Sequence, residues 1–273
     1  NWFTFEDYKA PTTPGYESGY LQNNNFRNRM YNFELLALYN NSWGNFDFNA
    51  TLGGNLYKVN NQTIVTTAKD MKIRDVVALM SFNEVSVEPY SYRKQINSIY
   101  GAVNLGWKHM LYFDATLRGD QSSTLPISNN MYIYPSFSGS FVFSELLKLG
   151  DKLPYGKVRM SWAQVGSDTD PYQLGLVYTK SKFAYPGYTI GYISNGTIPN
   201  KDLKPTKTNS FEMGLELKFL KNRIGLDFTY YSQLSKNQIM GMASSSTSGY
   251  GYRLINAGEI ENKGVEIALN TRP

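Results

Sequence analysis

The sequence predicts an all-β protein that forms part of an antiparallel transmembrane β-barrel wall, and three observations lead to this. Apolar and polar residues alternate along most of the chain, as in strands with one apolar and one polar face. Short turns alternate with long loops, which is the arrangement of outer-membrane barrels. Aromatic residues make up 15% of the 273 residues and charged residues only 18%, below the usual quarter.

The same composition excludes several classes of protein. Disordered segments and coiled coils carry more charge and fewer rings. No run of about eighteen apolar residues is present, so a transmembrane helix is excluded. The chain has no Cys and a single His, His109, which removes disulfides, thiolate metal sites and Cys nucleophiles. The net charge of +5 is scattered, so nucleic acid is not an expected partner.

The predicted strands are recognised by apolar residues at every second position. A helical turn is expected only near 144–149. Pro135 falls inside one strand, where its missing N–H requires a bulge or an edge. Nine strands are expected, with apolar residues alternating over 31–39, 46–56, 99–107, 111–117, 133–143, 158–162, 211–219, 224–230 and 265–269.

The clearest hairpin covers residues 211–231. A two-residue turn at Lys221-Asn222 joins its strands, because Asn tolerates the positive φ that such turns need. This turn places Glu216 opposite Asp227, a like-charge pair that costs free energy unless cations or water lie nearby. The predicted register pairs Phe219 with Ile224, Leu217 with Leu226 and Leu215 with Phe228.

The connections differ in length at the two ends of the strands. Rings at Trp43, Trp107 and Phe219 lie beside short turns, where an interfacial aromatic girdle is expected. If the short turns are periplasmic, the long segments face outward from the cell. A large soluble antiparallel β-protein with one buried face is the alternative that this pattern leaves open. The compact connections lie at 41–44, 108–110, 145–154 and 221–222, and the long ones at 59–92, 122–130, 167–208 and 238–259.

Four stretches also carry recognisable signatures, in order along the chain. They are YPSFSGSF at 134–141, KVRMSWAQVGSD at 157–168, PNKDLKPTKTNSFEMG at 199–214 and NAGEIENKGVE at 256–266. These are similar to the patterns FPS-S, K-R-SY-Q-G-ND, NPDLKPE-T-S-E-G and N-G---NKGVE, with Lys201 as a departure. From about Tyr92 to Pro273 the chain therefore resembles the barrel half of SusC/RagA-type TonB-linked outer-membrane transporters of Bacteroidetes.

This resemblance implies TonB-dependent import of a nutrient, an oligosaccharide or a peptide, across the bacterial outer membrane. It also implies a 22-stranded barrel, with a plug domain and a TonB box outside this chain. The implied partners are a SusD-like surface lipoprotein, TonB, outer-membrane lipid and the glycan or peptide substrate. No enzymatic activity, cofactor or metal is expected. Residues 1–273 are expected to be one segment of the barrel domain, an internal piece of a longer protein, since the chain lacks an initial Met and ends after a strand-like run.

Two alternatives to this function stay open. One is a siderophore- or cobalamin-type TonB-dependent receptor, which would act without the lipoprotein. The other belongs to a different class, a soluble carbohydrate-binding β-protein.

Charged residues on the polar side of the strands are candidates for docking the plug and hydrating the path. A pair such as Glu216 and Asp227 also suggests acid–base work of the glycosidase kind, but a lumen wall is polar in any case. His109 is interpreted as a solvated turn residue. The candidate lumen-facing residues are Asp114, Arg118, Lys157, Arg159, Glu212, Glu216 and Asp227.

Tyrosines of the long loops are candidates for substrate or lid contact, because rings give a large contact area with few rotors. Packing within the loops or an upper aromatic girdle is the alternative for any one ring. The run Ser167–Asp170 offers oxygen ligands of the kind that Ca²⁺ takes, although a polar strand end explains it as well. The ring candidates are Tyr90, Tyr92, Tyr172, Tyr185, Tyr188 and Tyr192, with 185, 188 and 192 expected to contribute most.

Overall fold

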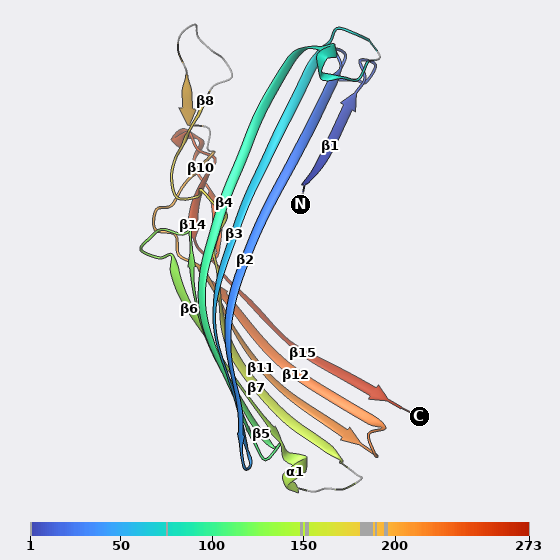
Figure 1. Cartoon of the computed structure of the whole chain (residues 1–273), viewed down its shortest axis with the longest axis vertical. Coiled ribbons are helices and arrows are strands. Elements are labelled where there is room, and N and C mark those ends of the chain that lie inside the picture. The colour runs from blue at the N-terminus through green and yellow to red at the C-terminus, as the bar shows by residue number, and fades with distance from the viewer. Residues whose placement is uncertain are drawn as a thin grey trace. The chain divides into compact units, whose positions relative to one another are not determined.

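A computed structural model describes residues 2–74, 76–147, 150, 153–180, 188, 190–193 and 196–272. Ten strands form one open sheet in the order β1-β2-β3-β4-β5-β6-β7-β11-β12-β15 (Figure 1). The prediction of an all-β antiparallel wall is confirmed, and β1 is a strand that the sequence did not reveal. The bounds are β1 Trp2–Lys9, β2 Tyr20–Trp43, β3 Phe46–Met71, β4 Phe82–Trp107, β5 Leu111–Ser122, β6 Met131–Val142, β7 Tyr155–Ser167, β11 Thr206–Phe219, β12 Ile224–Lys236 and β15 Glu259–Thr271.

Smaller elements lie mostly in segments that the sequence pattern predicts as loops. A three-stranded sheet has the order β10-β14-β13, and β8 pairs with β9. The helical turn expected near 144–149 is confirmed over 144–147 by α1, and residues 148 and 149 lie outside the described residues. Among the described residues, no helix is long and apolar enough to cross a membrane. The bounds are β8 Tyr178–Lys180, β9 Gly191–Ile193, β10 Thr197–Ile198, β13 Ile239–Ala243, β14 Tyr252–Asn256, α1 Phe143–Leu147, η1 Leu79–Ser81 and η3 Ser246–Ser248.

The chain divides into two compact units, residues 1–33 with 56–95 and residues 34–55 with 96–273. In the first unit Leu21, Ala68 and Phe82 form a small buried core. The predicted loop 59–92 is wrong, because β3 continues to Met71 and β4 already begins at Phe82. Runs such as NNQT at 60–63, in the second half of β3, put polar residues on both faces. The alternation of apolar and polar residues therefore cannot be seen there.

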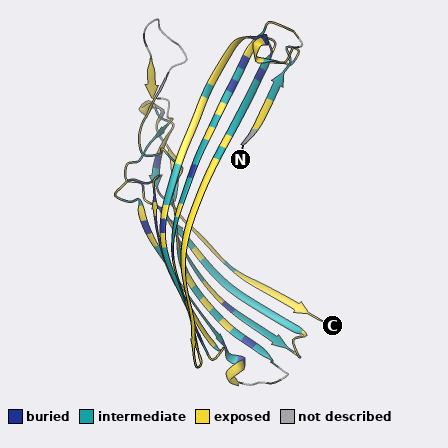
Figure 2. Cartoon of the chain, viewed as in Figure 1, coloured by how far each residue is buried: buried dark blue, intermediate teal, exposed yellow. Residues whose placement is uncertain are grey.

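The second unit shows the predicted two-sided strands. Large apolar side chains stand exposed on one side of the sheet, which we call the apolar face, and the charged ones lie on the opposite, polar face. Exposed and partly buried residues accordingly alternate along several strands (Figure 2). Leu35 is 80% exposed and Ile267 is 68% exposed. A soluble protein rarely exposes so large an apolar surface, so this face fits contact with lipid.

The β11–β12 hairpin has the predicted register. Phe219 pairs with Ile224, and the like-charge pair Glu216 and Asp227 lies cross-strand as expected. Lys221 and Asn222 both have positive φ, 56° and 65°, and the N–H of Arg223 donates to the Leu220 carbonyl over 3.2 Å. The turn thus has the backbone that two-residue hairpins favour.

Pro135 is accommodated by the end of a ladder. It pairs with Leu117 of β5, while the β6–β7 ladder begins one residue later, with Ser136 opposite Ala163. The missing N–H of the proline therefore costs no ladder hydrogen bond to β7.

Candidate functional site: a polar wall and the base of the long loops

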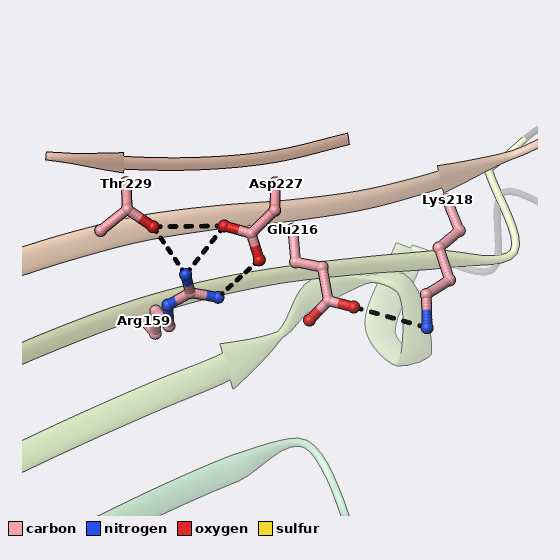
Figure 3. A network of polar contacts seen from close by, with 5 residues as sticks. All are labelled: Arg159, Glu216, Lys218, Asp227 and Thr229. Atoms are coloured by element: carbon pink, nitrogen blue, oxygen red, sulfur yellow. Dashed lines mark hydrogen bonds and ion pairs between the residues drawn. The ribbon is translucent and has the colours of Figure 1, made fainter. Parts of the chain in front are cut away.

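The polar face of β7, β11 and β12 carries an ion pair that crosses a strand (Figure 3). Arg159 of β7 reaches over β11 to Asp227 of β12. Its Nη1 donates to Oδ2 of Asp227 over 3.0 Å, and its Nη2 donates to Oδ1 over 2.8 Å. The same Nη2 also donates to Oγ1 of Thr229 over 2.7 Å. A bidentate arginine–carboxylate contact of this kind adds geometric specificity as well as energy.

Gly214 makes this crossing possible. In the register it lies opposite both Arg159 and Thr229. A Cβ on Gly214 would overlap the guanidinium and side-chain carbons of Arg159. The sequence showed Gly214 only as part of a family signature. Its role depends on Arg159 of β7, which is separated from Asp227 of β12 by the strand that carries Gly214.

The second carboxylate of the predicted like-charge pair has its own cation. Nζ of Lys218 lies 3.4 Å from Oε1 of Glu216 and 4.6 Å from the centroid of the Tyr155 ring. Lys157 is opposite Glu216 in the β7–β11 register. Since Arg159 binds Asp227 and Lys218 lies beside Glu216, cations offset the repulsion between these two carboxylates.

The remaining lumen candidates lie on the same face. Asp114 accepts hydrogen bonds from Nδ2 of Asn104, at 2.6 Å, and from Oγ of Ser138, at 2.8 Å. Arg118 donates from Nε to Asp120 over 2.9 Å and from Nη2 to Ser98 over 3.0 Å. Glu212 is opposite Ser161 and Tyr231. Hydrogen-bonded charges thus extend from β5 to β12.

Three long loops meet at a buried base, which we call the loop-base cluster. Its apolar part consists of Leu125, Tyr132, Leu203 and Leu254. Leu203 is fully buried, although it lies in the longest connection. The cluster therefore joins the β5–β6, β7–β11 and β12–β15 connections into one packed structure.

Polar contacts close the loop-base cluster. The carboxylate of Asp168 accepts hydrogen bonds from the buried hydroxyls of Ser122 and Thr124. Asn256 donates to the carbonyl of Lys204 over 2.7 Å and accepts from the N–H of Lys204 over 2.8 Å. It also donates to the carbonyl of Asn237 over 3.1 Å.

The four signatures converge on this cluster. Tyr134, from the first signature, packs against the apolar part of the cluster, and Asp168, Leu203 and Asn256 come from the other three signatures. This convergence is not visible in the sequence. The sequence offers Asp168 as a candidate calcium ligand, whereas in the structure its carboxylate accepts hydrogen bonds from two hydroxyls. No group of three or more potential metal-ligating side chains occurs within the described part of the chain.

The predicted ring candidates fall in several places. Tyr172 has a positive φ of 65°, and Tyr188 and Tyr192 are 73% and 51% exposed. Tyr90 and Tyr92 were expected at the end of a loop, but they lie within β4 because that strand begins at Phe82. Tyr185 lies outside the described residues.

Comparisons with known proteins agree with this geometry. The family model described as "TonB dependent receptor-like, beta-barrel" matches residues 1–272. TonB-dependent receptor P3 of Formosa agariphila is 26% identical over 250 residues, which cover 88% of this chain and 24% of the relative. TonB-dependent receptor SusC of Bacteroides thetaiotaomicron is 27% identical over 192 residues, 67% of this chain and 19% of the relative. The chain thus spans at most about a quarter of the length of these relatives.

Solved structures show the same fold. The RagAB peptide transporter matches with a TM-score of 0.87 and 21% identity, covering 97% of this chain and 30% of that chain. The outer-membrane transporter YddB from Escherichia coli matches with a TM-score of 0.58 and 13% identity, covering 92% of this chain and 31% of that chain. At these identities the likeness concerns the fold alone.

Proposed function

The chain belongs to the TonB-dependent receptor-like β-barrel family, and from that membership we propose that it serves TonB-dependent nutrient import. Barrels of this family lie in the bacterial outer membrane, and the exposed apolar face suits that location. Residues 1–273 would form one segment of the barrel domain. The observation that carries the proposal is the family match over residues 1–272.

The substrate class that we propose is an oligosaccharide or a peptide. Two observations support it. One is the similarity to the TonB-dependent receptor SusC, and the other is the fold shared with a protein described as a peptide transporter. The charged and hydrogen-bonded polar face supports a hydrated path, since lumen walls of such barrels are polar. The carboxylates of Asp227 and Glu216 are engaged by Arg159 and Lys218, which favours a structural and plug-docking role over acid–base chemistry.

The partners that we propose are a SusD-like surface lipoprotein, and TonB acting through regions outside this chain. The loop-base cluster supports the first partner, because it holds three long connections together at their base. Loops anchored in this way can present exposed rings such as Tyr172, Tyr188 and Tyr192 to a lid without collapsing.

Growth on defined nutrients tests the proposed function. A strain that lacks the complete gene should fail to grow on one class of glycan or peptide as sole nutrient, and the restored gene should rescue it. The purified transporter should also retain a surface lipoprotein. A defect confined to growth on iron–siderophore or cobalamin would support the receptor alternative instead. Normal growth on every nutrient would contradict the proposal.

A further inference from the structure

The apolar face has a hollow where a row of large side chains is interrupted. In the register of β4 to β7, Leu105 pairs with Phe113, Phe113 with Gly139 and Gly139 with Met160. Gly139 has no side chain, so it leaves a gap in that row. The resulting hollow has a volume of about 600 Å³ and is lined mainly by apolar residues.

Aromatic rings border this hollow. In the next row toward the short turn at 108–110, Trp107, Leu111, Phe141 and Val158 pair in succession. Trp107 also contacts Phe46, with 6.3 Å between ring centroids. The hollow therefore lies near one end of the strands, close to the level at which interfacial rings are expected.

A cation lies at the same end. Nζ of Lys108 is 4.9 Å from the centroid of the Trp107 ring, so the ammonium stays beside the rim of the hollow. In the part of the chain that the structure describes, no carboxylate forms an ion pair with Lys108. The hollow thus combines an apolar floor, an aromatic rim and an adjacent positive charge.

We propose that this hollow binds one anionic phospholipid, with an acyl chain over Gly139 and the phosphate beside Lys108. The hollow is continuous with the lipid-contacting apolar face, so acyl chains surround it. A chain lying in the gap gains contacts with Phe113, Phe141 and Met160 that a flat wall would not give. The positive charge selects an anionic headgroup. The inference rests on the outer-membrane location and not on the substrate.

Lipid retention by the complete transporter tests this site. The protein is purified from nanodiscs that contain phosphatidylglycerol and phosphatidylethanolamine, and retained lipid is counted by native mass spectrometry. Wild type should retain phosphatidylglycerol. Lys108→Asn should weaken that retention by roughly fivefold, the effect of one basic residue near a membrane surface. Asn suits the position because φ of Lys108 is +50°.

A second variant tests the apolar part of the site. Gly139→Leu should displace the acyl chain, and so abolish the retention of either lipid at this site. The added Cβ has room, because it would meet only the carbonyl oxygen of Tyr112, at 3.8 Å, and the rest of the leucine would extend into the hollow. Val265→Leu adds apolar volume to the same face on β15, where Val265 is 54% exposed, and should leave retention unchanged.

The charge variant also has a matched control. Lys221 lies in another short turn with a φ of +56°, and Lys221→Asn should retain phosphatidylglycerol as wild type does. Unchanged retention in Lys108→Asn and Gly139→Leu, or equal losses in the control variants, would overturn the proposal. Uptake is measured separately in the same strains, so a failure of the lipid site is distinguishable from a failure of the proposed import function.

Discussion

At the scale of single residues, the contacts of the polar face depend on glycines, which leave room for the long side chains of neighbouring strands. The opposition of Glu216 and Asp227 followed from alternation and one turn, so the sequence was enough to predict it. The pairing of Arg159 with Asp227 was not predictable, because it crosses a whole strand and needs Gly214 beneath the arginine. A period-two pattern places a residue on a face but does not reveal which long side chain extends over its neighbour.

Gly214→Ala should weaken the wall. The added Cβ would overlap Arg159 and force the guanidinium away from Asp227, at a cost of about 1–3 kcal/mol in the free energy of unfolding. Urea unfolding of the complete barrel in lipid vesicles measures this change. Gly225→Ala on the neighbouring strand is the control, since its Cβ would meet Asn270 only at 3.8 Å. Equal stability of the two variants would contradict the role assigned to Gly214.

Among the loop rings, Tyr185, Tyr188 and Tyr192 are predicted to contribute to substrate or lid contact more than the lumen charges do. Changing all three to Ala should lower lipoprotein affinity by about tenfold or more, because Tyr is enriched among the few residues that carry most of the binding energy of an interface, and should lower uptake with it. Replacing Tyr31 and Tyr39, exposed rings of β2, is the control. Wild-type affinity and uptake in a triple variant with normal heat-modifiable gel migration would place the contact elsewhere.

At the scale of elements, strands with one apolar and one polar face were predictable from the sequence, and the others were not. β11 and β12 alternate strictly because one face meets lipid and the other water. The outer half of β3 and the whole of β1 carry polar residues on both faces, so no single-sided pattern marked them. The loop-base cluster escaped prediction for a related reason, since its members come from three connections that the sequence does not bring together.

The alternation of β11 is directly testable. Spin labels on apolar-face positions should be accessible to oxygen dissolved in lipid, and labels on polar-face positions to a water-soluble nickel chelate, because the two environments alternate. A uniform profile along the strand would contradict the assignment of faces. The apolar-face positions are Met213, Leu215 and Leu217, and the polar-face positions are Glu212, Glu216 and Lys218.

At the scale of the whole molecule, three strands are far longer than a bilayer requires. β2 has 24 residues, and β3 and β4 have 26 each, whereas a tilted transmembrane strand needs about 9–11. If the short turns face the periplasm, more than half of each of these strands lies beyond the hydrocarbon on the outer side. This extension is not visible in the sequence, whose pattern predicts a loop over residues 59–92.

Single cysteines test this topology, and the segment itself contributes no other Cys. Lys69→Cys, near the outer end of β3, should react on intact cells with a bulky maleimide that cannot cross the outer membrane. Asn222→Cys, in a short turn, should react only after the outer membrane is opened. Labelling of Asn222→Cys on intact cells would reverse the assigned orientation of the wall.

The glycines of the polar face have a consequence for how the sheet finds its alignment. A slip of two residues keeps every apolar side chain facing lipid, so hydrophobicity does not oppose it, unlike a slip of one. Yet Gly53 lies under Tyr100, and Gly264 lies under Tyr231. After such a slip each ring would meet a Cβ in place of an empty position. These glycine–ring pairs favour the native register over the register shifted by two residues. They predict that a glycine and the ring above it change together in evolution.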